Sequence, residues 1–397
     1  MANTYFFLSK YFFSLLRYGA IACLLGIIAC NPGQKPNANH KEFQEEQSVL
    51  STTVSHAVGF DIEKRNESKV LHFFRHYNDA VDTLSYLLRE RKSPNDVHKI
   101  GVNEIVVPLK KIALLHSSYL AYFDILESTD ALVAISESKY VYDSGLYASI
   151  SGNEIHQVGY GETLDKEKLL SLDVGAVVTV GWPNAPNKSK QVLEELGLPV
   201  LILSEWQETT LLGRLEWIKV IGVLTGKESL ADSLFTSIAQ RYTDLQRLAK
   251  LAKDTPDVIC NLPYKGSWYM PGGDSYVSNV IQDAGANYLW SDHEGTGGIQ
   301  IAFEAVYAKG TTADYWINPG FAESAGEIIG KDERLNDFKA LKLGNIYNNN
   351  KRISRSKAND YWESGIVRPD LILADLIKVF HPELVPRHEF YYYKNLK

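Results

Sequence analysis

The sequence predicts an α/β protein with two doubly wound lobes joined by one long helix. Three features point to this class. Short apolar runs alternate with helical patterns over residues 105–207, the alternation restarts over 253–397, and a long amphipathic stretch separates the two regions. A run that is apolar throughout is typical of a parallel strand covered on both faces, and strands that alternate with helices indicate parallel sheets.

The composition agrees with a two-lobed globular protein. The chain has 397 residues, of which 45% are hydrophobic and 22% are charged, so one ordinary core would be too small for it. The net charge of -7 argues against a nucleic-acid partner, which would favour a basic face. The 23 tyrosines and seven tryptophans suit a protein that grips a planar or apolar ligand, although core packing is their more common use.

Residues 1–29 have the pattern of a signal peptide. Basic residues precede the apolar stretch "YGAIACLLGIIAC", which is too short for a membrane span. The stretch ends in Ile-Ile-Ala-Cys, which resembles a bacterial lipoprotein cleavage box and makes Cys30 the expected lipidated residue. Cys23 is the weaker alternative, and a plain signal-anchor helix is the other interpretation. Residues 30–52 are polar and should form a flexible tether.

Residues 53–104 are expected to form a β extension. Two apolar runs flank "KRNESK", which is a hairpin pattern, and we expect "DTLSYLLRE" and "NEIVVPL" to add edge strands. The N-lobe is then expected over 105–207. Its strands are "KIALL", "ALVAIS", "EIHQVG", "VGAVVTVGW" and "PVLILS", and its helices are "HSSYLAYFDILE", "LDKEKLLSL" and "KSKQVLEEL".

Residues 208–252 should be helical. The stretch "TLLGRLEWIKVIGVLTG" predicts a helix that ends at Gly226, and the next stretch repeats apolar residues at three- and four-residue steps from Leu230 to Leu245. We expect this second helix to bridge the lobes. Because bending a helix breaks its hydrogen bonds, the lobes should open only modestly around a ligand held between them.

The C-lobe is expected over 253–397. Its predicted strands are "DVICNL", "NYLW", "ADYWIN" and "NIYNN", and its predicted helices are "YVSNVIQDAG", "AFEAVYAKG", "RLNDFKAL" and "RPDLILADLIKVF". The segment "GSWYMPGGDSY" is interpreted as a loop that turns into a helix capped by Asp274 or Ser275, with Trp268 and Tyr269 on a pocket wall.

Signatures of catalysis and of metal binding are scarce. The sequence contains no G-x-G-x-x-G turn, no Walker lysine and no G-x-S-x-G elbow, and its cysteines have neither zinc spacing nor a disulfide framework. Cys260 is expected to be a buried apolar residue. We expect no dedicated metal site, although a cleft site built from His116, His293 and an acid stays open as an alternative.

Aromatic and hydroxyl residues follow several predicted strands. Ligands of doubly wound sheets bind at the carboxyl ends of strands, so such residues are candidates for ligand contacts. The candidates are Ser117, Ser118, Tyr119, Trp182, Trp206, Trp268, Tyr269, Trp290 and Trp362.

Three longer strings resemble the substrate-binding proteins of bacterial ABC importers for iron-siderophores, heme and cobalamin. They are "VGYGETLDKEKLLSLDVGAVVTVG", "IAFEAVYAKGTTADYWIN" and "YWESGIVRPDLILADLIKVFHPEL", and the similarity covers about residues 105 to 385. The resemblance implies two α/β lobes bridged by one rigid helix, with the ligand between the lobes. It also implies that Glu167 and Glu304 dock onto the two permease subunits.

The resemblance and the N-terminal pattern together give the expected function. The chain should be a monomeric, non-enzymatic binding protein, held by a lipid on Cys30 at the periplasmic side of a membrane. It should carry no cofactor of its own and deliver a metal chelate to a two-subunit ABC permease. The alternatives are a binder of bare zinc, manganese or iron on the same frame and a surface lipoprotein that scavenges ligand. A chelatase-like enzyme is disfavoured because Cys260 is the one cysteine of the folded body.

Overall fold

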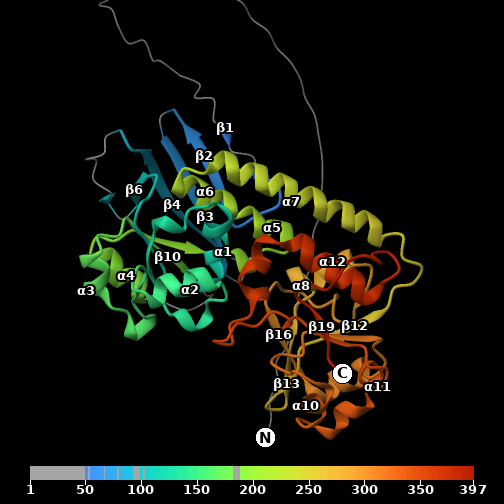
Figure 1. The fold of residues 1–397 in the computed structure, drawn as a ribbon. Helices are drawn as coiled ribbons and strands as arrows, with labels where there is room; N and C mark the ends of the chain where they lie inside the picture. Colours follow the sequence, from blue (N-terminus) through green and yellow to red (C-terminus); the bar gives the residue numbers. More distant parts are fainter. Residues whose placement is uncertain are drawn as a thin grey trace, which may run out of the picture. The chain divides into compact units, whose positions relative to one another are not determined.

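The computed structural model describes residues 50–51, 54–66, 68–77, 80–92, 99–101, 103–181 and 188–397. These residues form one six-stranded sheet, two five-stranded sheets and one three-stranded sheet (Figure 1). The two five-stranded sheets belong to the two predicted lobes. Within these ranges, no helix combines the length and the apolar character that crossing a membrane requires.

The N-terminal extension is a sheet rather than a hairpin alone. Its strand order is β1-β2-β3-β4-β6-β5, and the predicted hairpin is formed by its second and third strands. The alternation of buried and more exposed residues in β2 leaves one face to pack against the protein, as in a half-covered antiparallel sheet. The strands are β1 (Leu50–Ser51), β2 (Phe60–Arg65), β3 (Ser68–Tyr77), β4 (Ala80–Glu90), β5 (Lys99–Gly101) and β6 (Glu104–Val107).

The buried face of this sheet packs around Trp217. The indole ring lies 5.0 Å from the ring of Phe60 and stacks on that of Phe73 at 5.6 Å, measured between ring centroids. The backbone at Gly59, just before β2, lies so close to the Trp217 ring that a Cβ atom there would come within 2.7 Å of it. A glycine is therefore required at this position. The extension therefore shares a core with the helical region that follows the N-lobe.

Glu216 attaches the segment before β2 to the helical region. Its carboxylate is fully buried and accepts hydrogen bonds from the backbone N–H groups of Ser55, His56 and Ala57, the shortest being 2.7 Å from His56. The ammonium group of Lys219 lies 2.8 Å from the same carboxylate. Burial alone would raise the pKa of Glu216, but Lys219 and the backbone donors outweigh it and lower the pKa, so the group is held as a carboxylate.

Glu208 continues this attachment over the next two residues. It accepts hydrogen bonds from the backbone N–H groups of Val58 and Gly59 and from the indole N–H of Trp217, all at 2.9 Å. Five consecutive backbone N–H groups thus donate hydrogen bonds to two buried carboxylates. Nothing in the local sequence of residues 55–59 indicates this arrangement, since its acceptors lie about 150 positions later in the chain.

The N-lobe sheet is parallel throughout, as the continuous apolar runs predict. Its strand order is β11-β10-β7-β8-β9, and every residue of β7, β10 and β11 is buried. The strands are β7 (Ile112–Leu114), β8 (Leu132–Ile135), β9 (His156–Gln157), β10 (Ala176–Val180) and β11 (Val200–Leu203). The helices are η1 (Ser117–Tyr119), α1 (Leu120–Ile125), η2 (Thr129–Ala131), η3 (Ser138–Tyr140), α2 (Ser144–Ser151), η4 (Gly161–Thr163), α3 (Lys166–Ser171), α4 (Lys188–Glu195) and η5 (Glu205–Gln207).

The helical region contains three helices instead of the expected two. The first predicted helix is interrupted at Trp217, which separates α5 (Leu211–Glu216) from α6 (Ile218–Thr225). Its predicted end is confirmed, because Gly226 adopts the left-handed conformation at φ 72°. The long helix α7 (Glu228–Ala249) is also confirmed, and it packs against α6 at one end and α12 of the C-lobe at the other (Figure 1).

The C-lobe sheet has the order β15-β12-β17-β18-β19, in which the first four strands are parallel and the last is antiparallel. Its strands are β12 (Asp257–Cys260), β15 (Asn287–Tyr288), β17 (Tyr315–Ile317), β18 (Ile346–Asn348) and β19 (Lys394–Asn395). The helices are α8 (Tyr276–Asp283), α9 (Phe303–Gly310), α10 (Ala325–Ile329), η6 (Glu333–Asp337), α11 (Lys339–Lys342), η7 (Asp360–Trp362), η8 (Ser364–Val367) and α12 (Pro369–Phe380). Cys260 is buried, as expected.

The segment "GSWYMPGGDSY" is a strand where we expected a loop. β14 (Ser267–Pro271) pairs with β13 (Pro263–Tyr264) and β16 (Gly298–Ala302) in a small antiparallel sheet that the sequence did not indicate. The turn after the strand was predicted correctly. Ser275 caps α8, and its side chain accepts a hydrogen bond from the backbone N–H of Ser278.

Candidate functional site

The carboxyl ends of β7 and β11 bring several candidate residues to one edge of the N-lobe sheet. His116, Ser117 and Ser118 follow β7 and are half-buried, whereas Tyr119 is fully buried. The hydroxyl of Tyr119 donates a 2.6 Å hydrogen bond to the carboxylate of Glu205, which follows β11. Tyr119 is therefore a buried hydrogen-bond partner of Glu205, whereas His116, Ser117 and Ser118 are partly accessible to solvent.

Arg214 connects this edge to the C-lobe. One of its terminal nitrogens lies 3.2 Å from the Glu205 carboxylate, and its guanidinium group lies 4.2 Å from the centre of the Tyr276 ring at the start of α8. Burial disfavours the charge of Arg214, but Tyr276 and Glu205 outweigh it and raise the pKa of the guanidinium. A permanent cation is thus fixed between the lobes, with its Nε atom buried and without a hydrogen-bond partner.

His116 lies beside this cation as a neutral imidazole. Burial lowers the pKa of His116, and Arg214 lowers it further, while Glu205 opposes them. Its Nδ1 atom is buried and has no hydrogen-bond partner. His293 is exposed and bonded to Asp292 at 2.8 Å. Over the described ranges, no group of three or more His, Cys, Asp or Glu side chains could hold a metal ion.

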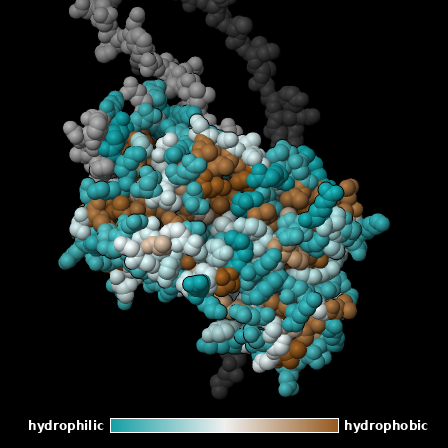
Figure 2. Space-filling model, viewed as in Figure 1, coloured by the Kyte–Doolittle hydropathy of each residue, from teal (hydrophilic) through white to brown (hydrophobic). Residues whose placement is uncertain are grey.

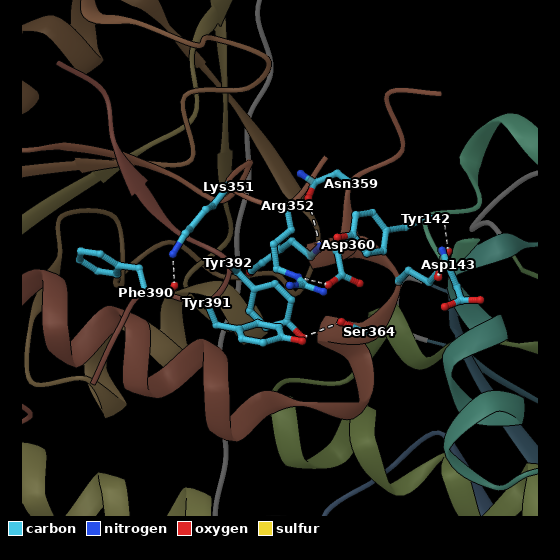
Figure 3. A network of polar contacts seen from close by, with 12 residues as sticks. Tyr142, Asp143, Lys351, Arg352, Asn359, Asp360, Ser364, Phe390, Tyr391 and Tyr392 are labelled. Carbon is cyan, nitrogen blue, oxygen red and sulfur yellow. Dashed lines mark hydrogen bonds and ion pairs between the residues drawn. The ribbon is translucent and has the colours of Figure 1, made fainter. Parts of the chain in front are cut away.

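A second polar network joins the lobes through the segment around η7 (Figure 3). The guanidinium group of Arg352 binds the carboxylate of Asp360 and lies over the rings of Tyr142 and Tyr391, at 5.3 Å and 4.4 Å from their centres. Tyr142 belongs to the N-lobe, and the other three residues belong to the C-lobe. The tyrosine and the cation together form a contact between the lobes, of the kind worth about 0.5–1 kcal/mol where solvent reaches it.

The remaining aromatic candidates divide into exposed and buried rings. Trp362, in η7, is 51% exposed, and Tyr269, on β14, is 48% exposed. Trp206 is half-buried, and its indole N–H donates to the carbonyl of Gly181 at 2.9 Å. Trp182 and Cys30 lie outside the described residues.

Trp268 and Trp290 are core residues. Trp268 is fully buried, packs against Trp316 at 5.5 Å between centroids, and donates its indole N–H to the carbonyl of Cys260. Trp290 is 2% exposed and packs beside Tyr288. Neither ring is available to a ligand from solvent in this arrangement, because strand alternation turns Trp268 inward and Tyr269 outward.

Several exposed aromatic residues were not named by the sequence analysis, and three of them are more than half exposed. Phe321 is completely exposed, Tyr264 is 62% exposed and Tyr140 is 60% exposed. Phe321 and Tyr140 lie beyond the carboxyl ends of β17 and β8, and Tyr264 ends the short strand β13, which follows β12. The viewed face of the molecule is mostly hydrophilic, with separate hydrophobic patches (Figure 2). Packing within the protein does not explain the exposure of the three rings.

The loop that carries Phe321 is held firmly on both sides. The side-chain amide of Asn348 donates to the carbonyls of Gly320 at 3.0 Å and Ala322 at 2.8 Å. The amide of Asn350 also donates to Ala322, at 3.1 Å. Because these bonds fix the backbone around the ring, Phe321 is presented to solvent by a structured turn.

The two candidate docking acids have matching positions in the two lobes. Glu167 is the second residue of α3, Glu304 is the second residue of α9, and both are exposed. A carboxylate in the first turn of a helix is favoured by the helix dipole, so both acids are stable there without a buried partner. Arg334 approaches Glu304 at 3.6 Å, and it leaves 77% of the Glu304 side chain exposed.

The fold agrees with a comparison against protein families. The periplasmic binding protein family matches residues 112–352, which span both sheets and the long helix between them. The chain belongs to this family. Members of the family are non-enzymatic binding proteins that act outside the cytoplasm, and membership implies a small ligand and an ABC permease as partner.

Related sequences include two lipoproteins of Methanocaldococcus jannaschii, both named as uncharacterized. One is 24% identical over 313 residues, which cover 75% of this chain and 72% of the relative. The other is 25% identical over 411 residues, covering 96% of this chain and 98% of the relative. The second match includes the N-terminal extension, so the extension is shared with a relative of nearly equal length.

Solved structures with the same fold bind different ligands according to their names. An ABC-type Fe3+-hydroxamate transport protein from Saccharomonospora viridis is 16% identical, with a TM-score of 0.53, over 78% of this chain and 99% of its own. A periplasmic heme-binding protein from Pseudomonas aeruginosa is 17% identical, with a TM-score of 0.52, over 69% and 93%. A molybdate-binding protein from Haemophilus influenzae is 15% identical, with a TM-score of 0.55, over 71% and 89%. At these identities the similarity establishes the fold alone.

Proposed function

We propose that this chain is the lipid-anchored binding protein of an ABC importer and captures a metal chelate between its lobes. The chelate is an iron-siderophore, a heme or a cobalamin-type molecule. The observation that carries this proposal is a group of exposed aromatic residues in both lobes, on segments that follow strands of the two five-stranded sheets. These residues are Tyr140 in the N-lobe and Tyr264, Tyr269, Phe321 and Trp362 in the C-lobe.

Chelates of this kind have large apolar or planar parts and a polar rim. Exposed rings bury such parts well, since an aromatic side chain offers a large contact area at a small cost in conformational entropy. The hydroxyl groups of Ser117 and Ser118 and the guanidinium of Arg214 are suited to the polar rim. The names of two solved structures with this fold, one for Fe3+-hydroxamate transport and one for heme binding, support the same ligand class.

The lipid anchor is proposed on Cys30, and the relatives named as lipoproteins support it. Docking onto the permease is proposed through Glu167 and Glu304. Their equivalent positions at the starts of α3 and α9 support this role, because a permease built around a two-fold axis would meet one acid from each lobe.

Tryptophan fluorescence of the full-length protein tests the ligand class. We expect a ferric hydroxamate, a ferric catecholate, heme or cobalamin to quench it in the micromolar range or below. Replacing Phe321 or Trp362 by alanine should weaken binding of the active chelate about tenfold, which corresponds to roughly 1.4 kcal/mol for one aromatic contact.

Leu251 provides the matched control for this experiment. It is 67% exposed, but it precedes β12 and therefore lies toward the amino end of the C-lobe sheet. Leu251→Ala should leave the affinity unchanged. If none of the four chelates quenches the fluorescence of the folded protein, the proposed ligand class is wrong. If Phe321→Ala, Trp362→Ala and Leu251→Ala lose the same affinity, the aromatic residues have no specific role in binding.

A further inference from the structure

A buried carboxylate of the C-lobe is bonded to the N-lobe backbone. Glu363 lies between η7 and η8 and is 6% exposed. One of its oxygens accepts a hydrogen bond from the backbone N–H of Tyr142 at 2.7 Å, and the other accepts from that of Asp143 at 3.0 Å. Both donors lie directly before α2 of the N-lobe. The carboxylate therefore spans the junction between the lobes.

No cation balances the charge of this carboxylate among the described residues. Two arginines of neighbouring segments have other carboxylate partners: Arg352 is bonded to Asp360 (Figure 3), and Arg368 to Asp370. Helices α1, α5 and α12 pack against η8. On α5, Arg214 is paired with Glu205 and Glu216 with Lys219, and on α12, Asp370 is paired with Arg241 and Arg368. On α1, burial together with Asp143 raises the pKa of Asp124. The other charged and titratable groups around Glu363 are Tyr142 and Asp143 of the N-lobe and Arg352, Asp360 and Tyr391 of the C-lobe.

This environment favours the neutral acid. Burial raises the pKa of Glu363 from 4.5 to about 7, and the negative charges of Asp360 and Asp143 act in the same direction. The two backbone N–H groups lower the pKa, but by less than burial raises it. The same carboxyl group would regain water if the lobes moved apart, because its N-lobe donors would leave it.

We propose that Glu363 is a clasp between the lobes and that it takes up a proton when the lobes close. This inference rests on the proposed function, in which the lobes close over a ligand. Closing removes water from a carboxyl group that has two hydrogen-bond donors and no cation, and such a group is stabilised by protonation. Ligand capture is thereby coupled to pH.

The sign of the coupling follows from the two states. In the open state the carboxyl group titrates in its ordinary range near 4.5, and in the closed state it titrates near 7. Between these values the closed state holds more protons, so acidification favours closing and a rise in pH favours opening. Between pH 7 and pH 4.5 the ratio of closed to open protein changes by up to about 300-fold. Chelate affinity should rise with acidification where the open state predominates.

Nuclear magnetic resonance of the full-length protein in detergent, without ligand, tests the clasp. The 13C resonance of the Glu363 carboxyl group, identified by its loss in Glu363→Gln, should titrate with a midpoint raised well above 4.5, which reaches about 7 where the closed state predominates. The amide resonances of Tyr142 and Asp143 should follow the same midpoint in the wild type. They should not follow it in Glu363→Gln or in Glu363→Asp, whose shorter side chain cannot span the junction.

Glu323→Gln, a change at an exposed acid of the C-lobe, should leave both titrations as in the wild type. A carboxyl midpoint near 4.5 would overturn the proposal. It would equally fail if the carboxyl group titrated near 7 while the two amides did not respond, or if the amides kept their midpoint in Glu363→Gln. Because no ligand is present, these outcomes are separate from the result of the chelate titrations.

Discussion

Replacing Glu216 by alanine is expected to lower the free energy of unfolding by about 3–5 kcal/mol, because it breaks a buried ion pair. The other carboxylate near Lys219, that of Asp232, lies 3.9 Å away and is more exposed. Lys219 is 7% exposed and has its 2.8 Å partner in Glu216. The same change removes the acceptor for the backbone N–H groups of Ser55, His56 and Ala57.

Urea unfolding monitored by circular dichroism measures this loss. Glu228→Ala is the matched control, since Glu228 also pairs with a lysine at 2.7 Å but is 35% exposed. A pair at the surface contributes about 0–1 kcal/mol. If Glu216→Ala destabilises the protein no more than Glu228→Ala, the extension is not held by this carboxylate.

The pH dependence of the same contact has a defined direction. The pKa of Glu216 is lowered below 4.5 in the folded protein, despite burial, by Lys219 and the backbone donors. The contribution of Glu216 to stability is therefore complete above pH 4.5 and is lost as the pH falls through its folded pKa. The pH dependence of the Glu363 contact has the opposite direction, because the pKa of Glu363 is raised and its contact is favoured by acidification.

Reversing the charge of both Glu167 and Glu304 to lysine is expected to abolish transport and to leave ligand affinity unchanged. Each acid is exposed in the first turn of its helix, so neither change disturbs the core. Placing a lysine against a basic pocket of a permease exchanges attraction for repulsion, which costs about 2 kcal/mol or more for each contact. Each single variant should therefore reduce transport about 30-fold.

Uptake of the active chelate by cells that contain the cognate permease measures transport, and fluorescence titration measures affinity. Glu154→Lys combined with Glu323→Lys is the control, because it reverses one other exposed acid in each lobe. A large loss of affinity in the Glu167 and Glu304 variants would assign these acids to the ligand site. Normal transport by the double variant would exclude them from docking.

The regular elements of the lobes were predictable because short stretches of sequence indicate which residues are buried. The runs at 176–180 and 200–203 are apolar throughout and form fully buried parallel strands. The long helix was predictable from its apolar spacing, and its beginning after Gly226 from the glycine itself. These signals are local, so one sequence is enough to interpret them.

The parts that were not predictable depend on distant partners. The helix before Gly226 breaks at Trp217 because that ring packs against Phe60 and Phe73 of the extension. β14 was taken for a loop because its pairing partner, β16, lies about 30 residues further along. The exposure of Phe321 depends on amide groups of Asn348 and Asn350, and no local pattern separates an exposed phenylalanine from a buried one.

The absorption spectrum of the protein, extracted with its lipid from the membranes of the cells that make it, tests chelate capture most directly. Heme, cobalamin and ferric siderophores each have a distinct visible spectrum. We predict that the protein carries one of these spectra as extracted or acquires one when the chelate is added, and that Phe321→Ala and Trp362→Ala reduce the bound fraction. A folded protein that remains colourless after exposure to all of these chelates would contradict the proposed function.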